Sequence, residues 1–388
     1  MRAPRSASIA VALVLLAPAC TLDRSERPSD SPDASAERTP EAPESIVTLG
    51  NGDPLPRSCS GGPAKARQDV AFVASGKAWA VDRGGTRLSC LFRVGEAGPF
   101  AWGPQGDRVL LADLEIRGIT GRDPSLGAIG QRVRAFDWGH PLGLAVVFAT
   151  SDPTPEKRFM DDGRVERLDE MPSGRYLDIA YHPSGRALAF VVDRGGRQRI
   201  WLSTNEGLDP VPLVYSRGGT RFTSIAFTPD GQRLVWTAQH AGGYPQIHAM
   251  DLADRTGFTD GWRGETGQAA TNLLLPPEGA LQAFDVGDTC GDRVATIALT
   301  PRVAHPALPD ADLPTTALGW LDGTTLLVGE GGCGDPMDVV AVDVGGNATP
   351  VVLGVEAAAA RTVTTAAPTS VPAPPNDAEE QPPPEGVG

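Results

Sequence analysis

The sequence predicts an all-β protein, a β-propeller of seven four-stranded antiparallel blades. One stretch, Thr223–Leu252, is patterned as three short strands joined by tight turns. The same pattern recurs along the chain at intervals centred near forty residues, which is the period of propeller blades. Six blades are the alternative if the weak copy around residues 281–313 is an insertion.

The best copy of the repeat shows why it should form strands and turns. Ile225 and Phe227 alternate with smaller or polar residues, as in a half-buried strand. In the turn Thr228–Gly231, proline presets φ, aspartate can bond its own backbone, and glycine accepts a positive φ. Leu234 and Trp236 then share one face of the return strand. A single unit of this kind has open edges and cannot bury its apolar face alone, so the other copies must supply partners.

Further copies run through most of the chain. The closest is Ile179–Phe190, followed by the turn Asp193–Gly196, and a third is Phe100–Leu111. Weaker copies are Ala135–Val147 and Leu318–Val328. The turn glycines of the seven copies are Gly76, Gly106, Gly143, Gly185, Gly231, Gly291 and Gly323. Their spacing sets the predicted blades.

The unit Phe227–Leu252 resembles the WD40-like (PD40) repeat of the TolB-type propeller family. Its Pro229–Gly231 turn and the segment Ile247–Asp251 match that family's pattern, and Asp193–Gly196 matches its middle turn. The resemblance covers roughly residues 69–353. It implies the propeller fold and protein–protein contacts through a propeller face near the cell envelope. It implies no chemistry, because the matching positions build turns and blade cores.

Residues 1–20 form a predicted lipoprotein signal peptide. Arg2 and Arg5 give a positive start, and Ile9–Leu16 is an apolar stretch too short to span a bilayer. Residues 17–20 resemble a bacterial lipobox, in which Cys20 becomes the lipidated N-terminus after cleavage. Ordinary secretion is the alternative, because the small residues before Cys20 also suit a simple cleavage site.

The number of cysteines favours lipidation of Cys20 and predicts two disulfides. The chain has five cysteines, an odd number for an exported protein, and lipidation of Cys20 leaves four. A bridge between Cys59 and Cys90 would fasten the segment before the first blade. A bridge between Cys290 and Cys333 would join the last two predicted blades. Four cysteines allow three connectivities, so both pairings are hypotheses.

Composition divides the chain into a signal peptide at 1–20, a disordered tether at 21–58, the propeller at 59–355 and a disordered tail at 356–388. The tether is rich in Ser, Pro, Asp and Glu, and the tail is rich in Thr and Pro, so neither can bury enough apolar surface to fold alone. The first predicted blade has three clear strands. We expect a terminal strand to complete the ring, either from Ile46–Leu49 or from part of Val355–Thr364.

Little in the sequence points to catalysis. A net charge of −14 without a basic stripe argues against nucleic acid as a partner. No nucleophile elbow, phosphate-binding loop or Cys-x-x-Cys occurs. We therefore predict no catalytic, cofactor-binding or metal-binding residues. Structural or surface roles are expected for the five histidines, which are His140, His182, His240, His248 and His305.

One aromatic residue is a candidate for ligand contact. Most tryptophans occupy repeat positions typical of blade cores, whereas Trp262 lies in the fifth-blade insertion Gly257–Gly267 and is expected on a loop.

These features together predict a lipoprotein on the outer face of a bacterial cell membrane, anchored through Cys20, or a secreted protein if Cys20 is not lipidated. Its propeller would act as a protein-binding or scaffold module, with an envelope protein as partner. One alternative is a propeller enzyme, a lyase or glycan hydrolase, that uses the central channel. Another is an extracytoplasmic protein that binds a glycan or small ligand.

Overall fold

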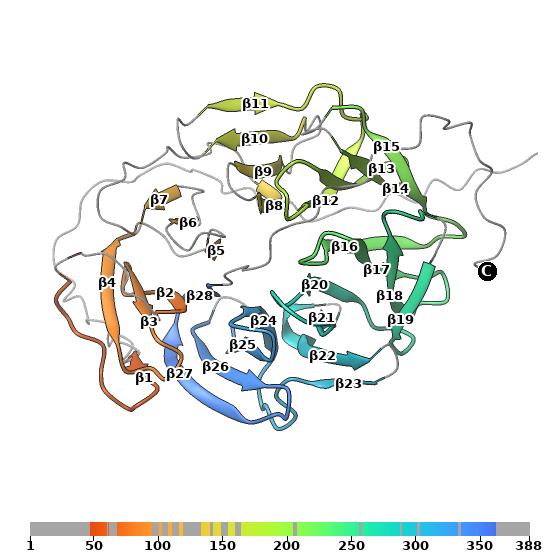
Figure 1. The fold of residues 1–388 in the computed structure, drawn as a ribbon. Coiled ribbons are helices and arrows are strands. Elements are labelled where there is room, and N and C mark those ends of the chain that lie inside the picture. The colour runs from red at the N-terminus through yellow and green to blue at the C-terminus, as the bar shows by residue number, and fades with distance from the viewer. Residues whose placement is uncertain are drawn as a thin grey trace, which may run out of the picture. The chain divides into compact units, whose positions relative to one another are not determined.

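Antiparallel sheets arranged as the blades of a propeller make up the described structure, a computed structural model (Figure 1). It describes residues 47–59, 61, 68–94, 101–102, 108–110, 116–118, 133–139, 143–148, 154–159, 164–204, 208–255, 258–287, 289–300, 303–332 and 335–361. These residues all belong to the second of two compact units, Ser45–Gly388. Within them, no helix is long and apolar enough to cross a membrane.

Four blades in the middle of the chain are each built from four consecutive strands, hydrogen-bonded in sequence order. The third predicted blade contains β8 (Val133–Gly139), β9 (Gly143–Phe148), β10 (Glu156–Phe159) and β11 (Val165–Arg167). The fourth contains β12 (Arg175–Tyr181), β13 (Leu188–Arg194), β14 (Arg197–Ser203) and β15 (Val211–Tyr215). The fifth contains β16 (Arg221–Phe227), β17 (Arg233–Gln239), β18 (Pro245–Asp251) and β19 (Phe258–Arg263). The sixth contains β20 (Ala270–Leu274), β21 (Gln282–Val286), β22 (Val294–Thr300) and β23 (Val303–Pro306), with a short 3-10 turn η1 (Cys290–Asp292).

Strands from both ends of the described chain complete the first and last blades. The first blade contains β2 (Val70–Ala74), β3 (Lys77–Val81), β4 (Leu88–Arg93) and, paired antiparallel with β2, the C-terminal strand β28 (Ala357–Ala360). The last contains β24 (Thr315–Trp320), β25 (Thr325–Gly331), β26 (Met337–Asp343) and β27 (Ala348–Val355), extended by β1 (Thr48–Leu49). Both segments expected to supply a closing strand do so: β28 joins the first blade and β1 joins the last.

The blade number differs from the prediction of seven four-stranded blades, which is wrong. The described residues form six sheets of at least four strands. In its described residues, the segment predicted as blade two, Pro99–Leu126, forms a three-stranded sheet of β5 (Ala101–Trp102), β6 (Arg108–Leu110) and β7 (Ile116–Gly118). The physical reason is strand length: the two or three residues of each described strand provide few cross-strand pairs.

The predicted turn chemistry is present in the two best copies of the repeat. In Thr228–Gly231, Gly231 has a φ of +71° and its N–H donates to the carbonyl of Thr228 at 2.8 Å. The Asp230 side chain accepts from the backbone N–H of Gln232 at 2.9 Å. Gly185 makes the equivalent bond to the carbonyl of His182 at 2.8 Å. The short turn connects β16 to β17, as the sequence pattern indicated.

The core consists of apolar side chains packed between neighbouring blades. Ala189 and Val191 of β13 pack with Ile225 and Phe227 of β16 and Trp236 of β17, all buried. The closing strands join a second cluster, in which Leu49 of β1 and Ala358 of β28 lie with Phe72 and Trp79 of the first blade. Each blade therefore buries one face against the next, which an isolated blade could not do.

The segment that leads into the first blade is fastened by the predicted disulfide between Cys59 and Cys90, whose Cα atoms are 5.5 Å apart. Cys90 lies on β4, and the same segment carries β1, which pairs with β27 of the last blade. The segment thus links the first blade to the last. Strands β1 and β28 lie in the ranges 21–58 and 356–388 expected as tether and tail, so the ordered fold extends beyond 59–355.

We predict that the double variant Cys59→Ser/Cys90→Ser is less stable by about 2–4 kcal/mol, because opening a cross-link between residues 31 apart restores freedom to the unfolded chain. The measurement is urea unfolding under non-reducing conditions. Ser58→Ala, an exposed change beside Cys59, is the control and should stay within about 0.5 kcal/mol of the parent. Equal stability of the double variant and the parent would show that β1 pairing alone holds the segment.

Candidate functional site

The polar groups that merit attention lie where neighbouring blades touch, on the first strand of a blade or close beside it. Strands β8, β12, β16, β20 and β24 follow one another, each in contact with the next (Figure 1). Three aspartates, Asp137, Asp178 and Asp285, lie on or beside these contacts. Each accepts a backbone N–H from the following blade, and we call these aspartates the interblade carboxylates.

Asp178 is placed for this contact by an irregularity of its own strand. The pairing of β12 with β13 shifts register between Tyr176 and Asp178. Such a bulge redirects the side chain that follows it. One carboxylate oxygen of Asp178 accepts the N–H of Ile179 at 2.9 Å, and the other accepts the N–H of Ile225 in β16 at 2.8 Å. Asp178 therefore ties the fourth blade to the fifth.

Asp137 makes the corresponding link from the third blade to the fourth. Its carboxylate accepts the N–H of Trp138 at 2.8 Å and that of Tyr181 in β12 at 2.7 Å. Burial raises the pKa of Asp137 to about 7, against the backbone bonds that lower it, and the nearby charge of Asp178 raises it further. Burial also raises the pKa of Asp178 to about 6. Both carboxyl groups are enclosed, although each residue as a whole is only half-buried.

Ser224 continues the series with a hydroxyl in place of a carboxylate. It follows a register shift between Phe222 and Ser224 in β16. Its oxygen accepts the N–H of Leu273 in β20 at 3.2 Å, so it ties the fifth blade to the sixth. The sequences around Asp178 and Ser224 align, each lying three residues before the aromatic residue that precedes the turn, Tyr181 or Phe227.

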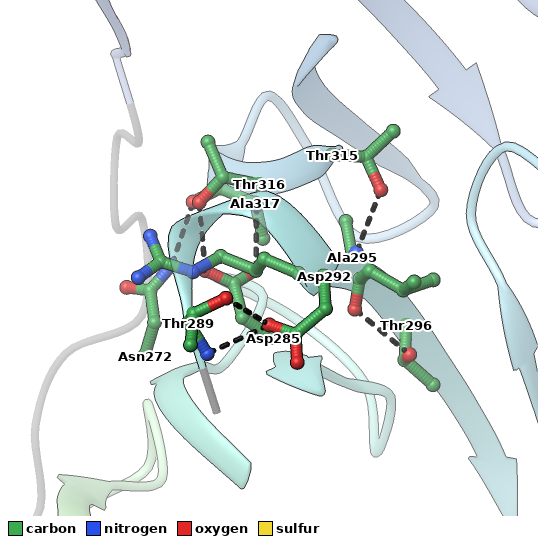
Figure 2. Close-up of polar contacts among 11 residues, drawn as sticks. Asn272, Asp285, Thr289, Asp292, Ala295, Thr296, Thr315, Thr316 and Ala317 are labelled. Atoms are coloured by element: carbon green, nitrogen blue, oxygen red, sulfur yellow. Dashed lines mark hydrogen bonds and ion pairs between the residues drawn. The ribbon is translucent and has the colours of Figure 1, made fainter. Parts of the chain in front are cut away.

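Asp285 forms the most completely bonded of these sites. It lies between the blade of β20–β23 and the last blade, that of β24–β27 (Figure 2). Its side chain is only 1% exposed. One oxygen accepts the N–H of Ala317 at 2.8 Å, and the other accepts the hydroxyl of Thr316 at 2.7 Å and the amide of Asn272 at 3.1 Å. Burial raises the pKa of Asp285 although these donors and the charge of Arg293 lower it.

At Asn272 the backbone of β20 departs from regular strand geometry, and this places the side chain in the Asp285 cluster. Asn272 has a φ of +54°, in the left-handed region that asparagine tolerates better than most residues. The pairing of β20 with β21 shifts register between Thr271 and Leu274 around it. Its side-chain amide donates to Asp285 and to the carbonyl of Ala317 at 2.7 Å, so one amide bridges two blades (Figure 2).

His182 joins blades at their turns. It is fully buried, and its Nε2 lies 2.8 Å from the carbonyl oxygen of Gly231 in the next blade's turn, while its Nδ1 lies 2.8 Å from the Ser184 hydroxyl. The ring also meets Phe227 edge to face, with centroids 5.1 Å apart. Burial lowers the pKa of His182, which favours the neutral ring. The histidine thus has the structural role expected for it.

These contacts decide what the arrangement can do chemically. The interblade carboxylates accept bonds from backbone N–H groups, an arrangement that stabilises a fixed geometry. Asp137 and Asp178 nevertheless have pKa values near neutrality, which general acid–base catalysis also requires. Among the described residues, no group of three or more His, Cys, Asp and Glu is placed to hold a metal ion.

Of the other residues named from sequence, Trp262 lies on a strand and not on a loop, so that expectation is wrong. It belongs to β19, the outermost strand of the fifth blade, and its ring lies 4.6 Å from that of Phe284 in the sixth blade. Pairing of β18 with β19 turns the insertion into a fourth strand. A ligand contact of the partly exposed Trp262 remains a prediction.

The remaining cysteines are only partly described. Cys290, in η1, is disulfide-bonded. Its predicted partner Cys333 and the predicted lipidation site Cys20 both lie outside the described residues. The pairing of Cys290 with Cys333 and the lipidation of Cys20 therefore stay predictions.

Comparison with known proteins agrees on the fold. The sequence matches no protein-family model and no curated protein. Similar solved structures include an oligogalacturonate lyase from Vibrio parahaemolyticus (12% identity, TM-score 0.55, covering 78% of this chain and 92% of that one). A second is an oligogalacturonate lyase in complex with manganese (12%, 0.53, 69% and 82%), and a third is TolB from Acinetobacter baumannii (14%, 0.46, 78% and 67%). The described sheets and the two lyase structures confirm the predicted propeller fold, and TolB is among the similar structures.

We predict that Asp178→Ala lowers the free energy of unfolding by about 2–4 kcal/mol, because it leaves the N–H groups of Ile179 and Ile225 without their acceptor at a blade contact. Chemical denaturation at pH 7 measures the loss. The control is Asp169→Ala, which removes a carboxylate that is 75% exposed and should change stability by less than about 0.5 kcal/mol. A loss at Asp178 no larger than at Asp169 would contradict an interblade role.

We also predict that stability falls as the pH rises from 5 to 8. The folded protein holds the proton of Asp137 up to a pKa of about 7, whereas the unfolded chain releases it near 3.8, so raising the pH favours unfolding. This group accounts for about 2–3 kcal/mol over that range. Urea unfolding at pH 5 and 8 should show a smaller difference in Asp137→Asn than in the parent.

His182 provides the internal check on this pH dependence, because its pKa is lowered and its effect has the opposite sign. The unfolded chain takes up a proton near pH 6.5 that the folded ring resists, so His182 reduces stability as the pH falls. His182→Asn should therefore steepen the loss of stability between pH 5 and 8. A steeper profile in Asp137→Asn, or a flatter one in His182→Asn, would contradict the assignment.

Proposed function

We propose that this protein is a cell-envelope lipoprotein, anchored by lipid on Cys20 to the outer face of the membrane, whose propeller is a protein-binding scaffold. The observation that carries the proposal is the use of the interblade carboxylates. Asp137, Asp178 and Asp285 each accept a backbone N–H from the next blade, so these buried acids already act as structural fasteners.

Exposed apolar side chains support a protein partner. Six large apolar residues are exposed in the described chain, and three of them belong to the sixth blade or the loop after it. These are Val294, Val303 and Leu313, with exposures of 37%, 51% and 58%. Covering these side chains with a partner would be favourable, because it removes apolar surface from water. We infer that the outer part of the sixth blade contacts the partner.

In-cell crosslinking followed by affinity capture of the full chain tests this proposal. We expect one defined envelope protein with the parent, loss of it with Val303→Asp/Leu313→Asp, and retention with Val165→Asp, an equally exposed residue of the third blade. Cys20→Ala should move the protein out of the membrane fraction and abolish metabolic labelling with fatty acid. Unchanged capture by the sixth-blade variant would refute that surface, and unchanged membrane association of Cys20→Ala would refute the anchor.

Catalysis is the second candidate function, favoured by the pKa values of Asp137 and Asp178 near neutrality. Solved oligogalacturonate lyases share the fold, so acidic oligosaccharides are the first substrates to try. Turnover that disappears in Asp137→Asn while its unfolding remains cooperative would establish the enzyme and displace the scaffold. Binding of such sugars without turnover, weakened by Trp262→Phe, would instead indicate a glycan-binding protein.

A further inference from the structure

A continuous stack of side chains crosses the hairpin of β17 and β18 and reaches β19. The guanidinium of Arg263 lies 3.6 Å from the centroid of the Tyr244 ring, and Tyr244 stacks on His240 with centroids 4.8 Å apart. His240 meets His248 at 5.4 Å between centroids, and His248 stacks on Trp236 at 5.5 Å. Two imidazoles, tilted by 60° to each other, thus lie in the middle of an otherwise aromatic stack.

The strand register explains how residues eight apart in sequence come together. His248 lies directly opposite Trp236 in the β17–β18 pairing, which places both rings on the same face. His240 follows β17 in the turn, where its backbone N–H donates to the carbonyl of Tyr244 at 2.9 Å. The residue between Trp236 and His240 on that face is Ala238, whose small side chain leaves room for the two imidazoles to meet.

The two imidazoles present matching nitrogen atoms to each other. The Nε2 atoms of His240 and His248 are 3.2 Å apart. When two imidazoles bind one tetrahedral ion at zinc–nitrogen distances of about 2.0–2.1 Å, their nitrogens are about 3.3 Å apart. The spacing therefore suits a single ion held by both rings. In its absence, a proton shared between the two nitrogens satisfies the same geometry.

We propose that His240 and His248 form a binding site for a transition-metal ion, with Cu²⁺ preferred over Ni²⁺ and Zn²⁺. Imidazole suits these ions, and the order of affinity follows the general order for divalent first-row metals. The proposal assigns two protein ligands, the imidazoles of His240 and His248, and leaves the remaining coordination positions to water. The site has two imidazole ligands, so it does not conflict with the absence, among the described residues, of a group of three or more metal-binding side chains.

The neighbouring side chains favour a fixed site. His248 is only 6% exposed and is held against Trp236, while His240 is partly exposed and is held against Tyr244. Because both rings are already oriented, binding costs little conformational entropy. Partial exposure of His240 places this ring of the pair next to solvent. Mg²⁺ and Ca²⁺ prefer oxygen ligands and should not bind there.

Titration of the full chain with CuCl₂, NiCl₂ and ZnCl₂, with free thiols blocked, tests the proposal. Calorimetry should show one ion per chain for Cu²⁺, removed by EDTA. Because Trp236 stacks on His248, bound Cu²⁺ should also quench part of the tryptophan fluorescence with the same midpoint. His240→Phe and His248→Phe keep an aromatic ring in the stack and remove one ligand each, so each should weaken Cu²⁺ binding by at least about tenfold.

His305→Ala is the matched control, since His305 lies in the sixth blade and should leave Cu²⁺ affinity and quenching unchanged. The proposal is overturned if both phenylalanine variants bind Cu²⁺ within twofold of the parent, or if His305→Ala weakens binding as much as they do. Loss of thermal stability in the phenylalanine variants, without any Cu²⁺-dependent rise in the melting temperature of the parent, would also overturn it and show that the pair is a structural hydrogen bond.

Discussion

The structure depends on a side-chain oxygen of one blade that accepts a backbone N–H from the first strand of the next. Asp137, Asp178 and Ser224 repeat this bond across three successive contacts, and Asp285 repeats it at a fourth. Apolar packing alone has no direction, and it would tolerate blades that slide past one another. A hydrogen bond to a specific backbone N–H sets the stagger, because a shift would leave a buried polar group unpaired.

Closure of the propeller follows from the same requirement that no buried edge stays open. The first blade borrows β28 from the C-terminal side, and the last blade adds β1 from the N-terminal side. The segment between β1 and the first blade is then cross-linked through Cys59 and Cys90. Opening the structure at this junction therefore requires separation of strands at both ends and is opposed by a covalent bond.

Local patterns were predictable from sequence, and contacts between blades were not. The Thr228–Gly231 turn, the closing strands and the Cys59–Cys90 bridge follow from turn residues, apolar runs and cysteine positions near one another in the chain. The role of Asp178 depends on a β-bulge that aims it at Ile225, which neither periodicity nor composition encodes. An alignment of Asp178 with Ser224 could have suggested a shared polar position, but no such repeat marks Asp285 or Asn272.

Some polar residues are needed to hold the blades together, and this limits which parts of the protein can form a functional site. A propeller fold alone specifies no activity. Activity must therefore come from side chains that are not required for structural contacts. Asp285 accepts three hydrogen bonds, whereas Asp137 and Asp178 accept backbone N–H groups and have pKa values near neutrality. Catalysis at these two acids would have to proceed without breaking the contacts that align the blades. The outer surface of the sixth blade carries no such constraint, and this asymmetry is the physical reason to favour binding over chemistry.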